Sequence, residues 1–150
     1  MVLACDIVIC SEKAEFMPVF ASRGHHGGRQ VPQLALKTTF SWALWTWLYK
    51  KSLDAQTAYR IGLVAEVVPQ DKLMSRATEM AETMCSYSQL SLRAVKERIN
   101  YLIKSVYKDA IDYMGPVNAE IRSSADYREG ARSFEEKRAP EFQHKTKGEK

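Results

Sequence analysis

The sequence predicts an α/β protein in which short strands come first and a helical C-terminal half follows. The β-branched run DIVIC, residues 6–10, is typical of a strand buried on both faces. The run LVAEVVP, residues 63–69, is a second strand that ends at a proline, and helical patterns lie between the two. From residue 70 onward the apolar residues recur at helical spacing, so we expect mostly helix there.

Between the two strands, residues 11–13 are turn-like and residues 14–16 form a further short strand. A loop with two adjacent histidines follows, ASRGHHGGRQVP. Pro32 then opens a helical region that continues to Leu48. This helix is apolar on nearly every side, and such a helix is either buried or packed against a partner.

The segment SLDAQTAYRIG predicts a capped helix. Ser52 or Asp54 can cap its start, and Gly62 lies where a left-handed C-terminal cap is expected. Two longer helices follow, with apolar repeats over residues 73–85 and 92–106. In the first of them, the spacing places three methionines in the core: Met74, Met80 and Met84.

The composition of the 150 residues suits one domain with a real core. A net charge of +4 suits a polyanionic small ligand and is too weak to indicate nucleic acid. The odd set Cys5, Cys10 and Cys85 has no CxxC spacing and predicts reduced, mostly buried thiols in a cytoplasmic protein. The most apolar window is about half the length that crosses a bilayer, so we expect no membrane partner.

Three segments carry a family resemblance. LACDIVICSEKAEF (3–16), SLDAQTAYRIGLVAEVVPQDKLMSRATEMAETM (52–84) and SADYREGARSFEEKRAPEF (124–142) resemble, in order and approximate separation, motifs of the enoyl-CoA hydratase/isomerase (crotonase) superfamily. The resemblance implies a partial crotonase (ClpP-like) spiral fold, with short β-strands followed by a helical C-terminal trimerisation region.

The resemblance also implies a division of the chain. Residues 1–69 are expected to form the back part of the spiral core with the active-site loop. Residues 70–142 form a helical region for oligomerisation and CoA contact, and residues 143–150 a polar tail. The family carries its oxyanion-hole donors upstream of the first matched segment. We therefore expect a partner chain with the N-terminal half of the fold, or a truncated product, and a trimeric or hexameric assembly.

Family enzymes stabilise the enolate of an acyl-CoA thioester with aimed N–H donors, and hydratases add paired carboxylates. In this sequence the family's "PE" is absent. Phe20 or Ala21 occupies the position of its glutamate, and no acid occurs between Glu15 and Asp54. The usual two-glutamate mechanism is therefore not supported by the residues of this chain.

The histidine loop keeps the glycine pair of the family's active-site loop, and the pocket-loop residues are Gly24, Gly27, Gly28 and Arg29. His25 and His26 are then candidate catalytic residues, because a neutral imidazole can act as general base or orient a water. The alternative is that both bond backbone groups beside the glycine turn. No metal is expected, since adjacent residues rarely converge on one ion and the only other histidine is His144.

The C-terminal motif implies coenzyme A contacts. In the family the aromatic residue and the lysine of "AFxEKR" approach the CoA adenine and phosphates, and here they are Phe134 and Lys137. The alternatives are helix core for the phenylalanine and a solvated face for the lysine. Arg23 and Arg29 are candidate phosphate or carboxylate contacts, with a solvated surface as the alternative. No cofactor is expected beyond the coenzyme A of the substrate.

Two other features have structural interpretations. Trp42, Trp45 and Trp47 replace a leucine-rich family helix and are expected to fill a core or an interface, with an acyl-pocket wall as the alternative. Asp6 follows the family pattern as a hydrogen-bonding residue without a catalytic role.

The sequence therefore predicts a part or subunit of an acyl-CoA enzyme of the enoyl-CoA hydratase/isomerase type, a lyase of fatty acid metabolism that acts by enolate stabilisation. The alternative is a non-catalytic crotonase-like fragment that binds CoA or oligomerises. A third hypothesis is a related hydrolase or lyase in which His25 or His26 is the base.

Overall fold

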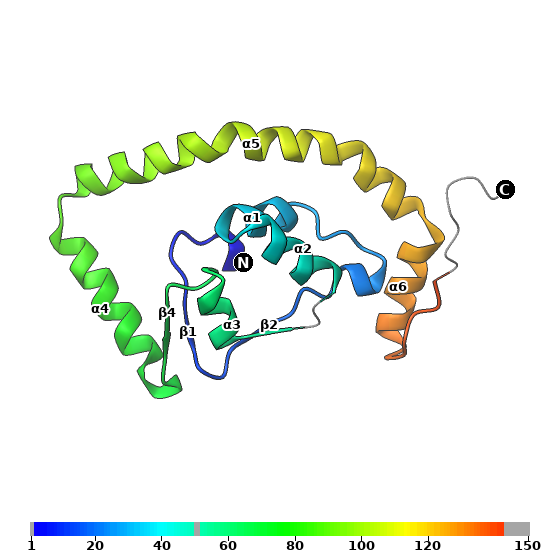
Figure 1. The fold of residues 1–150 in the computed structure, drawn as a ribbon, viewed down its shortest axis with the longest axis horizontal. Coiled ribbons are helices and arrows are strands. Elements are labelled where there is room, and N and C mark those ends of the chain that lie inside the picture. The colour runs from blue at the N-terminus through cyan, green and yellow to red at the C-terminus, as the bar shows by residue number, and fades with distance from the viewer. Residues whose placement is uncertain (1, 50–51, 143–150) are drawn as a thin grey trace.

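A small core of short strands and helices lies beneath an arch of three helices in the computed structural model, which describes residues 2–49 and 52–142 (Figure 1). The arch consists of α4 (Leu73–Ser86), α5 (Gln89–Ser123) and α6 (Ala125–Glu135). Figure 1 shows α5 running above the core from α4 at one end to α6 at the other. The predicted order, short strands first and helices afterwards, is confirmed.

The strands pair in two small sheets. β1 (Ile9–Ser11) lies parallel to β4 (Glu66–Val68), and β2 (Glu15–Phe16) lies antiparallel to β3 (Leu53–Asp54). The predicted strands are present but shorter. The N–H groups of Leu63 and Val64 donate to the carbonyl of Ala58, at 2.9 and 3.3 Å, so these two residues close a helix end before strand pairing begins.

The helix predicted from Pro32 to Leu48 is two helices, α1 (Gln30–Lys37) and α2 (Phe40–Leu48). Thr38 leaves the helical region with φ −123° and ψ −135°, and the hydroxyl of Thr39 caps α2 by accepting from Trp42 N at 3.3 Å. Such a cap satisfies one of the free N–H groups at a helix start. Pro32 sits in the first turn of α1, where a missing N–H costs no helical hydrogen bond.

The short helix α3 (Ala55–Arg60) confirms its predicted caps. Of the two candidates for its start, Asp54 is the one that caps, and its carboxylate accepts from Thr57 N at 2.7 Å. Gly62 follows the helix with φ +78°, a backbone conformation that glycine adopts without a Cβ penalty. Three 3₁₀ turns complete the order of elements: η1 (Val2–Ala4), η2 (Ala21–Arg23) and η3 (Gln70–Lys72).

The buried core lies among α1, α2, α3 and the strands. Leu34 of α1, Ala43 of α2, Leu53 of β3 and Ala58 of α3 are at most 4% exposed and belong to one cluster. No described side chain of α4 or α5 is fully buried. The apolar repeats of these helices therefore do not produce burial within this chain.

Two burial predictions are wrong for that reason. Met74 and Met84 of α4 are exposed instead of core, since α4 lies at the edge of the molecule (Figure 1), whereas Met80 is half-buried. Of the three cysteines, Cys10 is buried in β1, whereas Cys5 and Cys85 are exposed because they lie on an irregular segment and on α4.

α2 is not buried on all sides within this chain, which was one of the two alternatives predicted from its composition, the other being packing against a partner. It buries Ala43 and Thr46, while Phe40, Leu44 and Leu48 are 75%, 59% and 75% exposed. The reason is that only one side of α2 meets the core. None of the described helices is long and apolar enough to cross a membrane.

Candidate functional site

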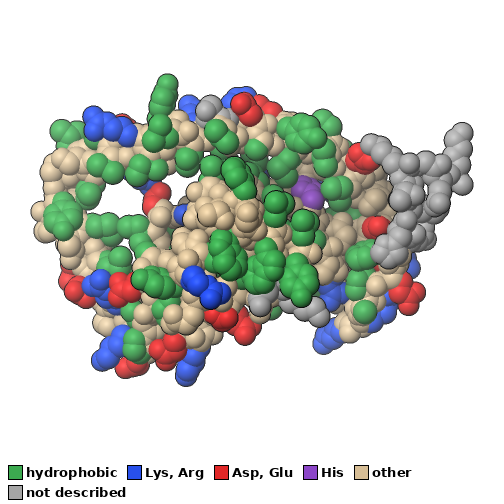
Figure 2. Space-filling view, viewed as in Figure 1, with side chains coloured by type: hydrophobic (Ala, Val, Ile, Leu, Met, Phe, Trp, Pro, Cys, Tyr) green, Lys and Arg blue, Asp and Glu red, His purple; other side chains and the backbone are tan. Residues whose placement is uncertain are grey.

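A groove of about 1070 Å³ runs between the core and the half of the arch that is formed by the end of α5 and by α6. One wall comes from the histidine loop, α1 and α2, and the other from the end of α5 and the start of α6. The exposed apolar side chains of α2 line it, together with Trp47. In Figure 2, histidine atoms are visible among hydrophobic side chains below α5. The site is thus an open, mostly apolar groove with a few polar groups.

The two histidines line this groove, and both are bonded to the backbone of their own loop. Nδ1 of His25 accepts from Gly27 N at 2.9 Å, and Nδ1 of His26 accepts from Gly28 N at 3.1 Å. A neutral imidazole that accepts at Nδ1 carries its proton on Nε2. Each imidazole is therefore held as the Nε2–H form, and its basic lone pair is occupied by the loop.

Aromatic neighbours hold the ring of His25. It stacks on His26 at 5.1 Å between centroids and contacts Phe20 at 5.3 Å and Tyr127 at 5.6 Å. Burial lowers the pKa of His25, and the nearby His26 and Arg122 lower it further. The imidazole is consequently neutral at neutral pH, because both causes disfavour the charged form.

The glycines make these bonds possible. Gly27 and Gly28 have φ +78° and +55°, which turns their N–H groups back toward the preceding side chains. Of the predicted pocket loop, Gly24 lines the groove with the histidines. Gly27, Gly28 and Arg29 lie behind it, at the entry to α1.

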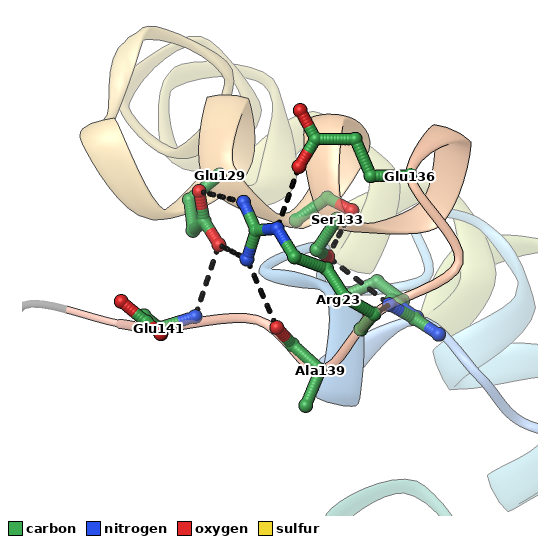
Figure 3. A network of polar contacts seen from close by, with 8 residues as sticks. Arg23, Glu129, Ser133, Glu136, Ala139 and Glu141 are labelled. Carbon is green, nitrogen blue, oxygen red and sulfur yellow. Dashed lines mark hydrogen bonds and ion pairs between the residues drawn. The ribbon is translucent and has the colours of Figure 1, made fainter.

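Arg23 holds α6 against the loop. Its guanidinium donates to the hydroxyl of Ser133 at 3.0 Å and to the carbonyl of Arg138 at 3.1 Å (Figure 3). The same guanidinium lies 5.6 Å from the centre of the Phe134 ring. Gly130 permits this contact, because a Cβ there would lie 1.9 Å from the carbonyl oxygen of Arg23. The side chain predicted as a candidate phosphate contact thus has protein partners.

A second part of the same network fixes the turn after α6. Glu129 accepts from the guanidinium of Arg138 at 2.6 and 3.1 Å and from Glu141 N at 3.0 Å (Figure 3). These bonds, the arginine's first, hold the pKa of the Glu129 carboxyl at about 2. A bidentate pair of this kind is geometrically specific, so the turn has a defined conformation.

The last turn of α6 and the turn after it carry the predicted CoA-contact residues. Phe134 is 67% exposed, and Lys137 is exposed in a left-handed conformation with φ +53°, its N–H bonded to the carbonyl of Phe134. Neither residue lines the groove. The structure therefore places both exposed side chains outside the groove, at the C-terminal end of α6 and just after it.

Sequence reasoning missed two carboxylates. Glu120 and Asp126 line the groove from the end of α5 and the start of α6. Helical spacing within α5 gave no sign of this, because the groove arises from the crossing of distant segments. Asp126 does fall in the third family-like segment, which was the one available signal.

The remaining predictions concern Asp6 and possible metal ligands. Asp6 forms an ion pair with Lys96 of α5 at 2.7 Å, with both side chains exposed. Among residues 2–49 and 52–142, no three histidine, cysteine or acidic side chains are grouped so that they could hold a metal ion. His144 lies outside the described residues.

The sequence pattern and the fold show that the chain is of the crotonase class. The chain belongs to the enoyl-CoA hydratase/isomerase family, whose sequence pattern matches residues 1–145. It is similar to a probable mitochondrial enoyl-CoA hydratase of Dictyostelium discoideum, with 32% identity over 97% of this chain and 53% of the relative.

Solved structures of the same family have a similar fold. An enoyl-CoA hydratase/isomerase from Pseudoalteromonas atlantica is 31% identical with a TM-score of 0.83, over 94% of this chain and 57% of the other. A carnitinyl-CoA dehydratase from Mycobacterium avium is 29% identical with a TM-score of 0.82, over 96% and 58%. The chain thus spans a little over half the length of these relatives, and the partial crotonase fold is confirmed.

Proposed function

We propose that this chain forms the acyl-group wall and the CoA-contact region of an enoyl-CoA hydratase or isomerase. The observation that carries the proposal is the groove between the histidine loop and α5–α6. Its size suits a small-molecule substrate, and its walls are apolar with few polar groups, as acyl-chain binding requires. Trp47 and the exposed side of α2 form the acyl-facing wall.

In this proposal, catalysis also requires the remaining part of the crotonase fold, which the longer relatives contain and these 150 residues do not match. That part supplies the N–H donors that stabilise the enolate oxygen, on the same polypeptide or on a partner chain. We propose that the active protein is a trimer or hexamer located in the cytoplasm. The exposed apolar side chains of α4 and α5, such as Met74, Leu90 and Leu102, would become buried in such an assembly.

Coenzyme A is proposed to bind at the turn after α6. The exposed ring of Phe134 offers a face to adenine, and the exposed ammonium of Lys137 suits a pyrophosphate. The Glu129–Arg138 pair holds this turn in place, so both side chains are presented from a defined backbone.

The test is an assay of the protein purified from its source in its native assembly. Hydration of crotonyl-CoA and isomerisation of a 3-enoyl-CoA are measured with the wild-type protein and with Lys137→Ala. Loss of a charge-assisted bond to phosphate is expected to weaken acyl-CoA binding about 5- to 10-fold. Lys13→Ala, which removes an exposed lysine in the turn after β1, is the matched control and keeps wild-type binding.

Three results would decide the proposal. Turnover together with the Lys137→Ala effect supports it. Acyl-CoA binding without turnover would favour the non-catalytic, CoA-binding alternative. An assembly that neither binds acyl-CoA nor converts it would refute both.

A further inference from the structure

The groove presents N–H donors without matching acceptors. Because Nδ1 of His25 is occupied by Gly27 N, its remaining ring nitrogen is Nε2–H. Within the described residues this N–H has no protein acceptor, although the ring lines the groove. The ring is fixed on other sides by stacking with His26 and by contact with Phe20 and Tyr127. The donor is thus held in one orientation before any ligand arrives.

Two further donors on the same wall have the same imbalance. Nε2 of His26 and Nε1 of Trp47 are enclosed and have no hydrogen-bond partner among the described residues, and both side chains line the groove. Gln30 and Thr46 also carry an unpartnered oxygen each, but neither residue lines the groove. An enclosed donor without an acceptor is costly and is rare in native proteins. Because these two atoms are enclosed, a ligand in the groove does not reach them, and the donor that the wall offers to a ligand is Nε2–H of His25.

The charge of the opposite wall restricts which acceptor fits. Glu120 and Asp126 line the groove from α5 and α6. A carboxylate at the end of an acyl chain would meet the negative charge of Glu120 there, and like charges in a partly desolvated site repel. The positive charge of Arg122 also acts on His25, but Arg122 does not line the groove. A ketone, ether or hydroxyl oxygen accepts from an imidazole N–H without that repulsion.

We propose that His25 is a specificity-determining residue, whose Nε2–H donates to a neutral oxygen on the acyl group of the substrate. The acyl class is then a chain that carries a ketone, ether or hydroxyl oxygen. The inference rests on the proposed function, because it places the acyl group in the groove. It replaces the predicted role of His25 as general base with that of hydrogen-bond donor.

The test measures binding to the native assembly by calorimetry. The probes are octanoyl-CoA, its oxo isomers with the ketone at each carbon from the fourth to the seventh, and suberoyl-CoA. At least one oxo isomer is expected to bind about 5-fold more tightly than octanoyl-CoA. His25→Asn keeps an acceptor for Gly27 N, and its shorter side chain no longer places a donor at the position of Nε2, so it brings that ratio to about one. Gln56→Asn, on the exposed side of α3, keeps the wild-type ratio.

A second measurement needs no variant. Long-range ¹H–¹⁵N correlation of the histidine rings distinguishes the two neutral tautomers, and His25 is expected to show Nε2–H at neutral pH. A ring found as Nδ1–H would overturn the proposal, and so would equal binding of octanoyl-CoA and every oxo isomer. Tightest binding of suberoyl-CoA would refute the neutral acceptor. Absence of binding by all the probes would instead contradict the proposed function itself.

Discussion

Replacement of Gly130 by alanine tests how α6 is attached to the core. Gly130 is buried in α6 against the backbone of Arg23. A Cβ at this position would lie 1.9 Å from the carbonyl oxygen and 2.4 Å from the carbonyl carbon of Arg23. Ordinary contact begins at 3.4 Å, so α6 and the loop must separate by about 1.5 Å.

The magnitude follows from opposing contributions. Alanine in a helix interior is favoured over glycine by about 1 kcal/mol. Overpacking against an unyielding backbone costs about 1–3 kcal/mol. The separation also breaks the bond from Arg23 to Ser133, which costs about 1 kcal/mol more. The net expectation is a loss of about 2 kcal/mol in the free energy of unfolding.

The assay is urea unfolding of the purified protein, followed by circular dichroism. Gly115→Ala is the matched control, because it makes the same change in helix α5 where a Cβ meets nothing within 4 Å. That control is expected to be neutral or to stabilise by up to about 1 kcal/mol. If Gly130→Ala is as stable as Gly115→Ala, the close approach of α6 to Arg23 is wrong.

Three further predictions concern other parts of the fold. Asp54→Ala removes the cap of α3 and is expected to lower the urea midpoint by the equivalent of about 1 kcal/mol, whereas Asp54→Asn retains most of it. The depressed pKa of Glu129 stabilises the folded state fully above pH 4.5, and this contribution is lost as the pH falls toward 2. The urea midpoint should therefore fall over that range, and less steeply in Glu129→Gln. Burial raises the pKa of the Cys10 thiol, so it should react with a thiol reagent only on unfolding, while fast reaction is expected at the exposed thiols of Cys5 and Cys85.

The fold was largely predictable where local chemistry decides the structure. The cap at Asp54 and the left-handed turn at Gly62 were both expected, because each depends on residues within one helix turn. The break at Thr38 was missed, since apolar residues continue at helical spacing across it. The threonine pair there was the available signal, because a hydroxyl at a helix start competes with the continuing helix.

The candidate site was less predictable because it joins distant segments. The alternative in which both histidines bond backbone groups could be formulated from the adjacent glycines, and the structure shows those bonds. The acids Glu120 and Asp126 could not be placed, as they reach the groove only through the path of α5. The role of Arg23 was equally hidden, because its partner Ser133 lies 110 residues away.

That sequence separation has a consequence for synthesis of the protein. The loop with Arg23 leaves the ribosome 110 residues before Ser133, and at ~5–20 residues per second the interval is roughly 5–20 s. Throughout that time the groove has only the wall formed by the histidine loop, α1 and α2, and apolar side chains of that wall such as Trp47 have no cover from α5 and α6. The nascent chain therefore exposes this apolar wall until α6 packs against the loop. Its yield in cells should depend on chaperones that bind the exposed wall during that interval.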